Sequence, residues 1–501
     1  MLLNSIINRV KLMFVICCYM FCINTMQGQQ LIKISLKETL QLATKNSLDA
    51  FKAKRQYAID YWKYKSFNAK FLPSVDLNFE PFTYNRSLVK RYDPTNNIDV
   101  YKQQQSLNMF SELSISQNIM AMGTKVYVNS NFNRLTNYGD ATIKNYSTTP
   151  IRIGIIQPIM AYNELKWLNK TALLAYEKAK KDFVFNEQKI NIDATSLFFK
   201  WALNSAKVTI AKETKINAEK LYKIAVKRYR IGAIEKDDLL NLELEEYTSK
   251  TNLSKAIQEL ENVVFDLKQF LNKEDIELYE PELPILISNL KINLVDAENY
   301  MNLNNPDLLN TSIRKINAAR DLDKVTKENR FKLSINASYG LNQQSNNFSD
   351  AYRNFLDQQI VAVRFSMPVL DWGERKGIIK TAKMTKELAD IEIQQTINEV
   401  KRQLVLKVRN FNLQEAQVLA TLRAKEIASQ SYEITQKRFL SGKVDLLRLL
   451  NSRKAWQTAT EQYIQSLQLY WTYYYEVQQL TLYNFLERKT LKESFESILE
   501  D

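Results

Sequence analysis

Apolar and polar residues alternate along four short segments of the chain. In residues 361–367 apolar side chains occupy every odd position, with Arg364 and Ser366 between them. Similar alternation runs through residues 75–80, 151–155 and 333–342. This period of two predicts strands with one apolar and one polar face. With their flanks, the segments approach the roughly nine to eleven residues that cross a bilayer as a tilted strand. The half-buried face of a soluble sheet would give the same pattern.

Two much longer segments, residues 159–231 and 378–441, contain neither glycine nor proline. Helices over these segments would be roughly 100 Å long at about 1.5 Å per residue. The usual globular helix has only about 11–12 residues. We therefore expect one long helical hairpin over residues 162–271 and a second over residues 377–489.

The sequence around the two expected turns is repeated. The first turn has the sequence KRYRIG, ending at Gly232, and a Leu-Leu-Asn follows that ends at Asn241. The second turn has the sequence KRFLSG, ending at Gly442, and the same three residues follow, ending at Asn451. Each glycine can supply the positive φ that closes a helix. The separation of 210 residues also relates Pro158 to Pro368. The chain therefore reads as an internal two-fold repeat.

The front of each half is repeated at a wider separation. Leu36, Asn46 and Asp49 match Leu294, Asn304 and Asp307. Helices are expected over residues 36–72 and 294–330. The wider separation places additional sequence in the first half, around residues 86–140. Within it, residues 113–116 and 125–128 indicate a hairpin around Gly123, and the Asn, Ser and Tyr around them are typical of an exposed loop. Whether this hairpin joins the sheet stays open.

The expected organisation is a signal peptide at residues 1–28, a first repeat at 29–285, a second repeat at 286–489 and a tail at 490–501. Arg9 and Lys11 precede an apolar core that is shorter than the about 20 residues of a membrane-spanning helix, and Gly28 is a small residue at the expected cleavage point. A lipid anchor at Cys22 and a buried N-terminal helix are the alternatives.

Composition narrows the possible chemistry. The chain has no histidine, and its three cysteines lie within the first 22 residues. Loss of the signal peptide would exclude disulfides, thiolate nucleophiles, Cys/His metal sites and Ser-His-Asp triads. Phosphate-binding glycine loops are also absent from the sequence. We expect no enzyme and no cofactor, although a carboxylate-pair or lysine-based enzyme is compatible with the composition.

The net charge of +14 is spread along the expected helices. This distribution favours a basic helical surface over a nucleic-acid site, which would need clustered basic and aromatic residues. Outside the signal, no apolar run reaches the length of a membrane-spanning helix, so the chain is either soluble or spans a membrane with strands. Four strands cannot close a barrel alone, and closure would need several chains around a symmetry axis.

These features together resemble the TolC-type outer-membrane efflux protein family, over essentially all of the mature chain. The resemblance rests on the two repeated openings, the strand-Pro-helix junctions at Pro158 and Pro368, the Arg-aromatic-x-x-Gly turns and the Leu-Leu-Asn after each turn. It implies a mainly α fold in a homotrimer. A twelve-stranded β-barrel, with four strands per chain, would sit in the outer membrane lipid and continue as an α-helical tunnel through the periplasm. The implied function is efflux or secretion, together with a periplasmic adaptor and an inner-membrane pump.

The resemblance also suggests site residues. The hairpin tips that meet the adaptor would be Arg230, Ile231, Gly232 and Ala233 in the first repeat and Leu440, Ser441, Gly442 and Lys443 in the second. The periplasmic constriction would involve Asp238, Asn241, Asp445, Arg448 and Asn451. Arg448 and Asn451 stand where the family carries aspartates. Three copies of Arg448 would form a positive ring and weaken cation selectivity, unless Arg448 pairs with Asp445 or Asp238.

A periplasmic structural or adaptor coiled-coil protein is the alternative function, with the long helices as spacers and no membrane-embedded strands. Cell fractionation separates the two, because a channel stays in the outer membrane until detergent extracts it.

Overall fold

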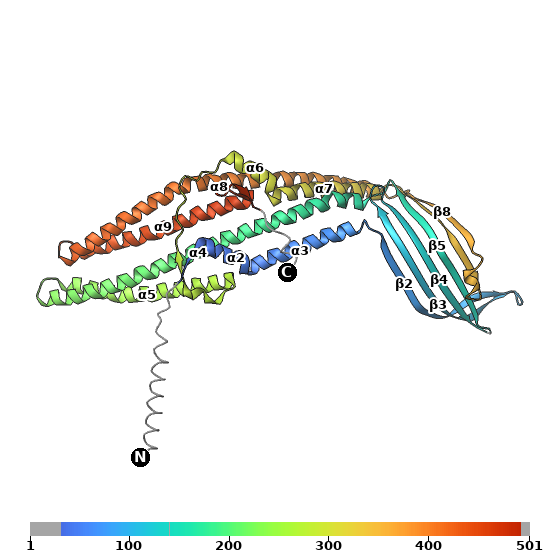
Figure 1. Cartoon of the computed structure of the whole chain (residues 1–501), viewed down its shortest axis with the longest axis horizontal. Coiled ribbons are helices and arrows are strands. Elements are labelled where there is room, and N and C mark those ends of the chain that lie inside the picture. The colour runs from blue at the N-terminus through green and yellow to red at the C-terminus, as the bar shows by residue number, and fades with distance from the viewer. Residues whose placement is uncertain (1–31, 140, 492–501) are drawn as a thin grey trace, which may run out of the picture. The chain divides into compact units, whose positions relative to one another are not determined.

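The computed structural model describes residues 32–139 and 141–491 of the 501-residue chain (Figure 1). The expected signal peptide, with its three cysteines, and the tail from residue 492 onward lie outside the described residues. The described residues form two compact units. The first comprises residues 32–54, 184–300 and 404–491, and the second comprises residues 55–183 and 301–403.

Four long helices dominate the fold, as the absence of glycine and proline predicts. They are α4 (Glu164–Arg230), α5 (Lys236–Leu271), α8 (Glu374–Leu440) and α9 (Leu446–Thr481). The helices α4 and α8 have 67 residues each, and α5 and α9 have 36 each. The last helix is shorter than expected, because Leu482 adopts a left-handed conformation (φ 48°) and ends it. The two-residue strands β9 (Tyr483–Asn484) and β10 (Lys489–Thr490) follow.

The helices expected at residues 36–72 and 294–330 are each broken in two, so the expectation of continuous helices there is wrong. Their pieces are α2 (Leu36–Asn46), α3 (Leu48–Ala69), α6 (Leu294–Asn304) and α7 (Pro306–Glu328). At the first break the Ser47 hydroxyl accepts a hydrogen bond from the Ala50 N–H at 3.1 Å. At the second, the Asn305 side chain accepts one from the Asp307 N–H at 2.9 Å, and Pro306 lacks the N–H of a continuous helix. Each break therefore starts a new, capped helix.

A small parallel sheet joins the start of the first unit to the segment after α5. The strand β1 (Ile32–Ser35) pairs with β6 (Tyr279–Glu282), which follows the short helix η1 (Glu274–Leu278). Ser35 and Glu38 then form a capping box at the start of α2. Between α8 and α9, Phe411 and Tyr470 pack with ring centroids 5.1 Å apart, and the Tyr470 hydroxyl donates to the Ile287 carbonyl at 2.9 Å.

The second unit contains a six-stranded antiparallel sheet (Figure 1). Its strands, in spatial order, are β2 (Ser74–Asp93), β3 (Ile98–Ile119), β4 (Thr124–Tyr138), β5 (Ile143–Ile159), β7 (Lys332–Ser345) and β8 (Leu356–Ser366). The short helix η2 (Asp350–Tyr352) lies in the connection between β7 and β8.

Four strands per chain were expected, and the sheet corrects that number to six. The expected hairpin around Gly123 exists, with φ 68° at Gly123 and Ile119 opposite Thr124, and it joins the sheet as β3 and β4. Residues 86–139 are mostly strand rather than exposed loop. Their many polar residues suit a strand because one face of each strand is largely polar.

Candidate functional sites at the hairpin turns and on the sheet

The two helical hairpins turn in the same way. Gly232 and Gly442 have φ of 72° and 73°. The Ala233 N–H donates to the Arg228 carbonyl and the Gly232 N–H to the Tyr229 carbonyl, and the second turn repeats both bonds from Lys443 and Gly442. This pair of bonds is the Schellman motif, in which a left-handed residue satisfies the last carbonyls of a helix.

The eight residues suggested as adaptor-contacting tips are all exposed. Ile231 is the most exposed apolar residue among them, at 79%. The two turns are also joined, because the Arg228 guanidinium donates to the Leu440 carbonyl at 2.9 Å. The structure therefore brings the tips of both repeats together as one surface of the first unit.

An apolar cluster supports this surface. Leu221 and Ala225 of α4, Leu242 of α5, Tyr432 of α8 and Leu449 of α9 are buried together. The Tyr432 and Trp456 rings stack with centroids 5.2 Å apart. Burial raises the pKa of the Tyr432 hydroxyl, which accepts a long hydrogen bond of 3.4 Å from the Asn217 amide. An ion pair of 2.6 Å between Arg453 and Glu245 links α9 to α5.

The five residues suggested for the constriction lie in or beside the first turns of α5 and α9, and all are exposed. Asp445 caps α9, since its carboxylate accepts a hydrogen bond from the Arg448 backbone N–H at 2.7 Å. Within residues 32–139 and 141–491, the Arg448 side chain forms no ion pair with Asp445 or Asp238. Sequence spacing alone could not separate a bond to the backbone of Arg448 from one to its side chain.

One face of the sheet is apolar and exposed. Residues directly opposite each other in neighbouring strands lie on the same face. One such row runs across five strands and consists of Val75, Ile115, Val128, Ile153 and Tyr339. On β8 the same face carries Val361 and Val363, which are 75% and 65% exposed. A contiguous apolar face of this extent indicates a surface that contacts protein or lipid.

The other face of the sheet is polar. Asn129 on β4 donates to the Glu112 carboxylate on β3 at 3.0 Å and accepts from the Arg152 guanidinium on β5 at 3.0 Å. Gly340 of β7 lies directly opposite Arg152. A Cβ atom at Gly340 would approach the Arg152 Cβ to 2.8 Å, so glycine is required there. Polar contacts therefore cross three neighbouring strands, β3, β4 and β5.

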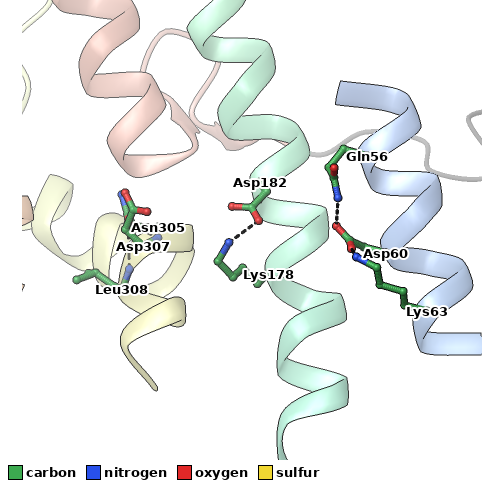
Figure 2. A network of polar contacts seen from close by, with 8 residues as sticks. All are labelled: Gln56, Asp60, Lys63, Lys178, Asp182, Asn305, Asp307 and Leu308. Carbon is green, nitrogen blue, oxygen red and sulfur yellow. Dashed lines mark hydrogen bonds and ion pairs between the residues drawn. The ribbon is translucent and has the colours of Figure 1, made fainter. Parts of the chain in front are cut away.

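Polar side chains of α3, α4 and α7 lie near one another in the second unit, and each helix makes its own polar contacts (Figure 2). On α3, Asp60 contacts Lys63 and Gln56; on α4, Asp182 contacts Lys178 at 2.6 Å. Asp307 lies in the first turn of α7. Burial raises the pKa of the Asp182 carboxyl, and Asp307 and Asp60 add repulsion, whereas Lys178 opposes the shift.

The described residues contain no group of three or more acidic residues placed to hold a metal ion. No helix among them combines the length and the hydropathy of a membrane-spanning segment.

Comparisons with known proteins found one matching family model and several similar folds. Residues 301–481 match the model of the outer membrane efflux protein family. The fold is similar to that of the Campylobacter jejuni CmeC outer membrane channel (TM-score 0.65, 14% identity, 93% of this chain and 88% of that chain). It is also similar to that of a membrane protein from Pseudomonas aeruginosa (TM-score 0.64, 12% identity, 90% of this chain and 91% of that chain). A further similar structure is the outer membrane protein VceC from Vibrio cholerae (TM-score 0.61, 12% identity, 89% of this chain and 95% of that chain). No curated protein matches the chain.

Proposed function

We propose, from the match of residues 301–481 to the model of the outer membrane efflux protein family, that the chain is an outer-membrane channel for efflux or secretion. It acts as the exit duct of a tripartite pump, with a periplasmic adaptor and an inner-membrane transporter. The observation that carries the proposal is the exposed apolar face of the six-stranded sheet, opposite a hydrogen-bonded polar face. Such a sheet suits a wall with lipid on one side and water on the other.

The sheet also supports a homotrimer. Within the described residues, β2 pairs only with β3 and β8 only with β7, so both strands leave an edge open. Unpaired backbone groups are not tolerated in lipid. An even number of antiparallel strands lets β8 of one chain pair antiparallel with β2 of the next, and three chains related by rotation then close the wall.

Closure of the wall would bring specific helices of neighbouring chains together. The strand β2 directly follows α3, and β8 directly precedes α8. Pairing of these two edges therefore sets α3 of one chain beside α8 of the next. On α3, the side chains of Ile59 and Trp62 are 50% and 66% exposed. The helices α7 and α8 enclose a groove of 760 Å³, whose lining includes Leu322, Ile378 and Ala382. We assign the groove to α3 of the neighbouring chain.

The helical hairpins would carry the contacts with the pump. The exposed tips (Arg230, Ile231, Gly232, Ala233, Leu440, Ser441, Gly442 and Lys443) form the adaptor surface. The proposed constriction lies at Asp238, Asn241, Asp445, Arg448 and Asn451, as the family resemblance suggests. The mechanism needs no chemistry in this chain, because a wet path alone lowers the barrier for polar solutes to cross lipid. Energy for transport would come from the inner-membrane partner.

Cell fractionation tests the proposal. The expressed protein should stay in the outer-membrane fraction through a high-salt wash and be extracted only by detergent, as a trimer. Release by salt as a monomer would instead favour a periplasmic spacer protein and end the proposal.

A further inference from the structure

We infer that the hairpin of β3 and β4 is part of the channel wall, so that three chains close a barrel of eighteen strands lined by Glu112, Asn129 and Arg152. The inference rests on the proposed trimer, since three six-stranded sheets give this number. It departs from the twelve strands that the family resemblance implies.

The backbone ladders support membership of the wall. The ladder between β3 and β2 runs from the pair Ser116 and Ser74 to the pair Ile98 and Asp93. The ladder between β3 and β4 begins at the pair Ile119 and Thr124. The strand β4 pairs in turn with β5. An accessory hairpin outside the wall would leave β2 and β5 to pair with each other. Two complete strands separate them instead.

The apolar face continues across the inserted strands without a gap. Ile115 of β3 and Val128 of β4 lie in one row between Val75 of β2 and Ile153 of β5. A slip by one residue would turn these side chains to the polar face. The register therefore gives the inserted strands the same lipid-facing surface as their neighbours.

The polar face is continuous as well. Glu112 and Asn129 belong to the inserted strands, and their hydrogen bonds reach Arg152 on β5. Arg152 in turn lies against Gly340 on β7, where any larger residue would collide with it. The inserted strands and β5 thus share one polar network, which would line the lumen.

The number of strands sets the width of the exit. With strands about 4.8 Å apart and tilted by about 40°, eighteen strands give a diameter of about 36 Å between backbones, and twelve give about 24 Å. The wider cylinder leaves an aqueous channel after its side chains are in place. The barrel would then not be the narrowest part of the path, and selection of the cargo would fall to the helical region.

Pairs of engineered cysteines test the strand order in the full chain, with the three native cysteines replaced by serine. Asn78, Glu112, Asn131 and Thr149 lie in one row on the polar face. The pair Asn131→Cys with Thr149→Cys should form an intrachain disulfide under mild oxidation. The pair Asn78→Cys with Thr149→Cys should not, because three strand spacings of about 14 Å exceed the Cα separation of about 7 Å that a disulfide tolerates.

The reverse result, with a disulfide only between positions 78 and 149, would place the hairpin outside the wall and overturn the inference. Absence of both disulfides would overturn it too. Neither result would affect the proposed function, which fails on a different measurement, the loss of trimers from the outer-membrane fraction.

Discussion

At the scale of single residues, Arg448 is the clearest departure from the pattern that the family resemblance implies. Its side chain is exposed, and the carboxylate of Asp445 is engaged by the backbone N–H of Arg448. In a trimer, three guanidinium groups would repel cations at a narrow point of the pore. We predict weak cation preference, or anion preference, for the wild-type channel. Arg448→Asp should raise the cation-to-anion permeability ratio several-fold, and Arg448→Gln should give an intermediate value.

Reversal potentials in a salt gradient across a planar bilayer measure this ratio. Strong cation preference in the wild-type channel that Arg448→Asp leaves unchanged would show that Arg448 does not line the constriction.

The partly buried carboxyl of Asp182 allows a prediction about pH. Burial raises its pKa in the folded chain, so the ionised form destabilises the fold. That cost is present above the folded pKa and disappears below the unfolded value of about 3.9. Asp182→Asn should therefore raise the melting temperature at neutral pH. Because the side chain is about one-third exposed, the gain in the free energy of unfolding should be less than about 1 kcal/mol. The gain should vanish at acidic pH.

Lys178→Met is the matched control for Asp182→Asn. It removes the cation that opposes the pKa shift and should lower the melting temperature at neutral pH. A melting temperature that falls in Asp182→Asn at pH 7 would mean that the charged pair stabilises the helices, contrary to this prediction.

The sequence located the two glycine turns but not most of the contacts around them. Gly232 and Gly442 could be assigned to turns because a repeated glycine at a helix end has a specific backbone role. Contacts such as Arg228 with the Leu440 carbonyl, or Arg453 with Glu245, join residues about 210 positions apart in the chain. No local pattern encodes which hairpin face meets which, so only the folded unit reveals them.

At the scale of elements, the glycine turns give a test with an internal control. Gly232 and Gly442 have positive φ and open space where a Cβ atom would lie, so alanine there meets no steric neighbour and only backbone strain. That strain costs roughly 1 kcal/mol. We predict that Gly442→Ala speeds amide hydrogen exchange around the second turn about fivefold, as a 1 kcal/mol loss requires.

Gly377 is the control for Gly442. It lies inside α8, likewise has open space around it and has no positive φ. Gly377→Ala should stabilise the helix by about 0.4–1 kcal/mol, because alanine restricts the unfolded chain. Equal slowing of exchange in both variants would contradict the role assigned to the Gly442 turn.

The elements that the sequence missed share a physical cause. The strands β1 and β6 have four residues each, too few to show a period of two. The break at Ser47 depends on a hydroxyl that can equally face solvent in a helix. Much of β2, β3 and β4 resembled a loop because their polar face is rich in Asn and Ser, which are common in turns. The long helices could be predicted because glycine and proline usually mark the turns of a chain, and these segments contain neither.

At the scale of the whole molecule, β2 and β8 leave two edges of the sheet open within the described residues, so a single chain would be incomplete as the proposed channel wall. A wall in lipid cannot end in unpaired backbone groups. Closure by neighbouring chains must then also settle which helices meet. Because α3 leads into one edge and α8 leaves the other, the closing of the sheet and the packing of the helices would be one event in the proposed trimer.

Trp62 tests that coupling directly. Its indole is 66% exposed in the single chain and should fill the groove between α7 and α8 of the next chain in the trimer. Trp62→Asp would place a charge in that apolar contact. We expect a large loss of trimer in detergent, measured by light scattering, whereas Trp62→Phe should keep most of it because an aromatic ring remains. Burial of an aromatic side chain contributes roughly 1.5–3 kcal/mol per site, and the threefold symmetry multiplies the effect. Trimers of Trp62→Asp as stable as those of Trp62→Phe would show that α3 does not occupy the groove, and would separate the closing of the sheet from the packing of the helices.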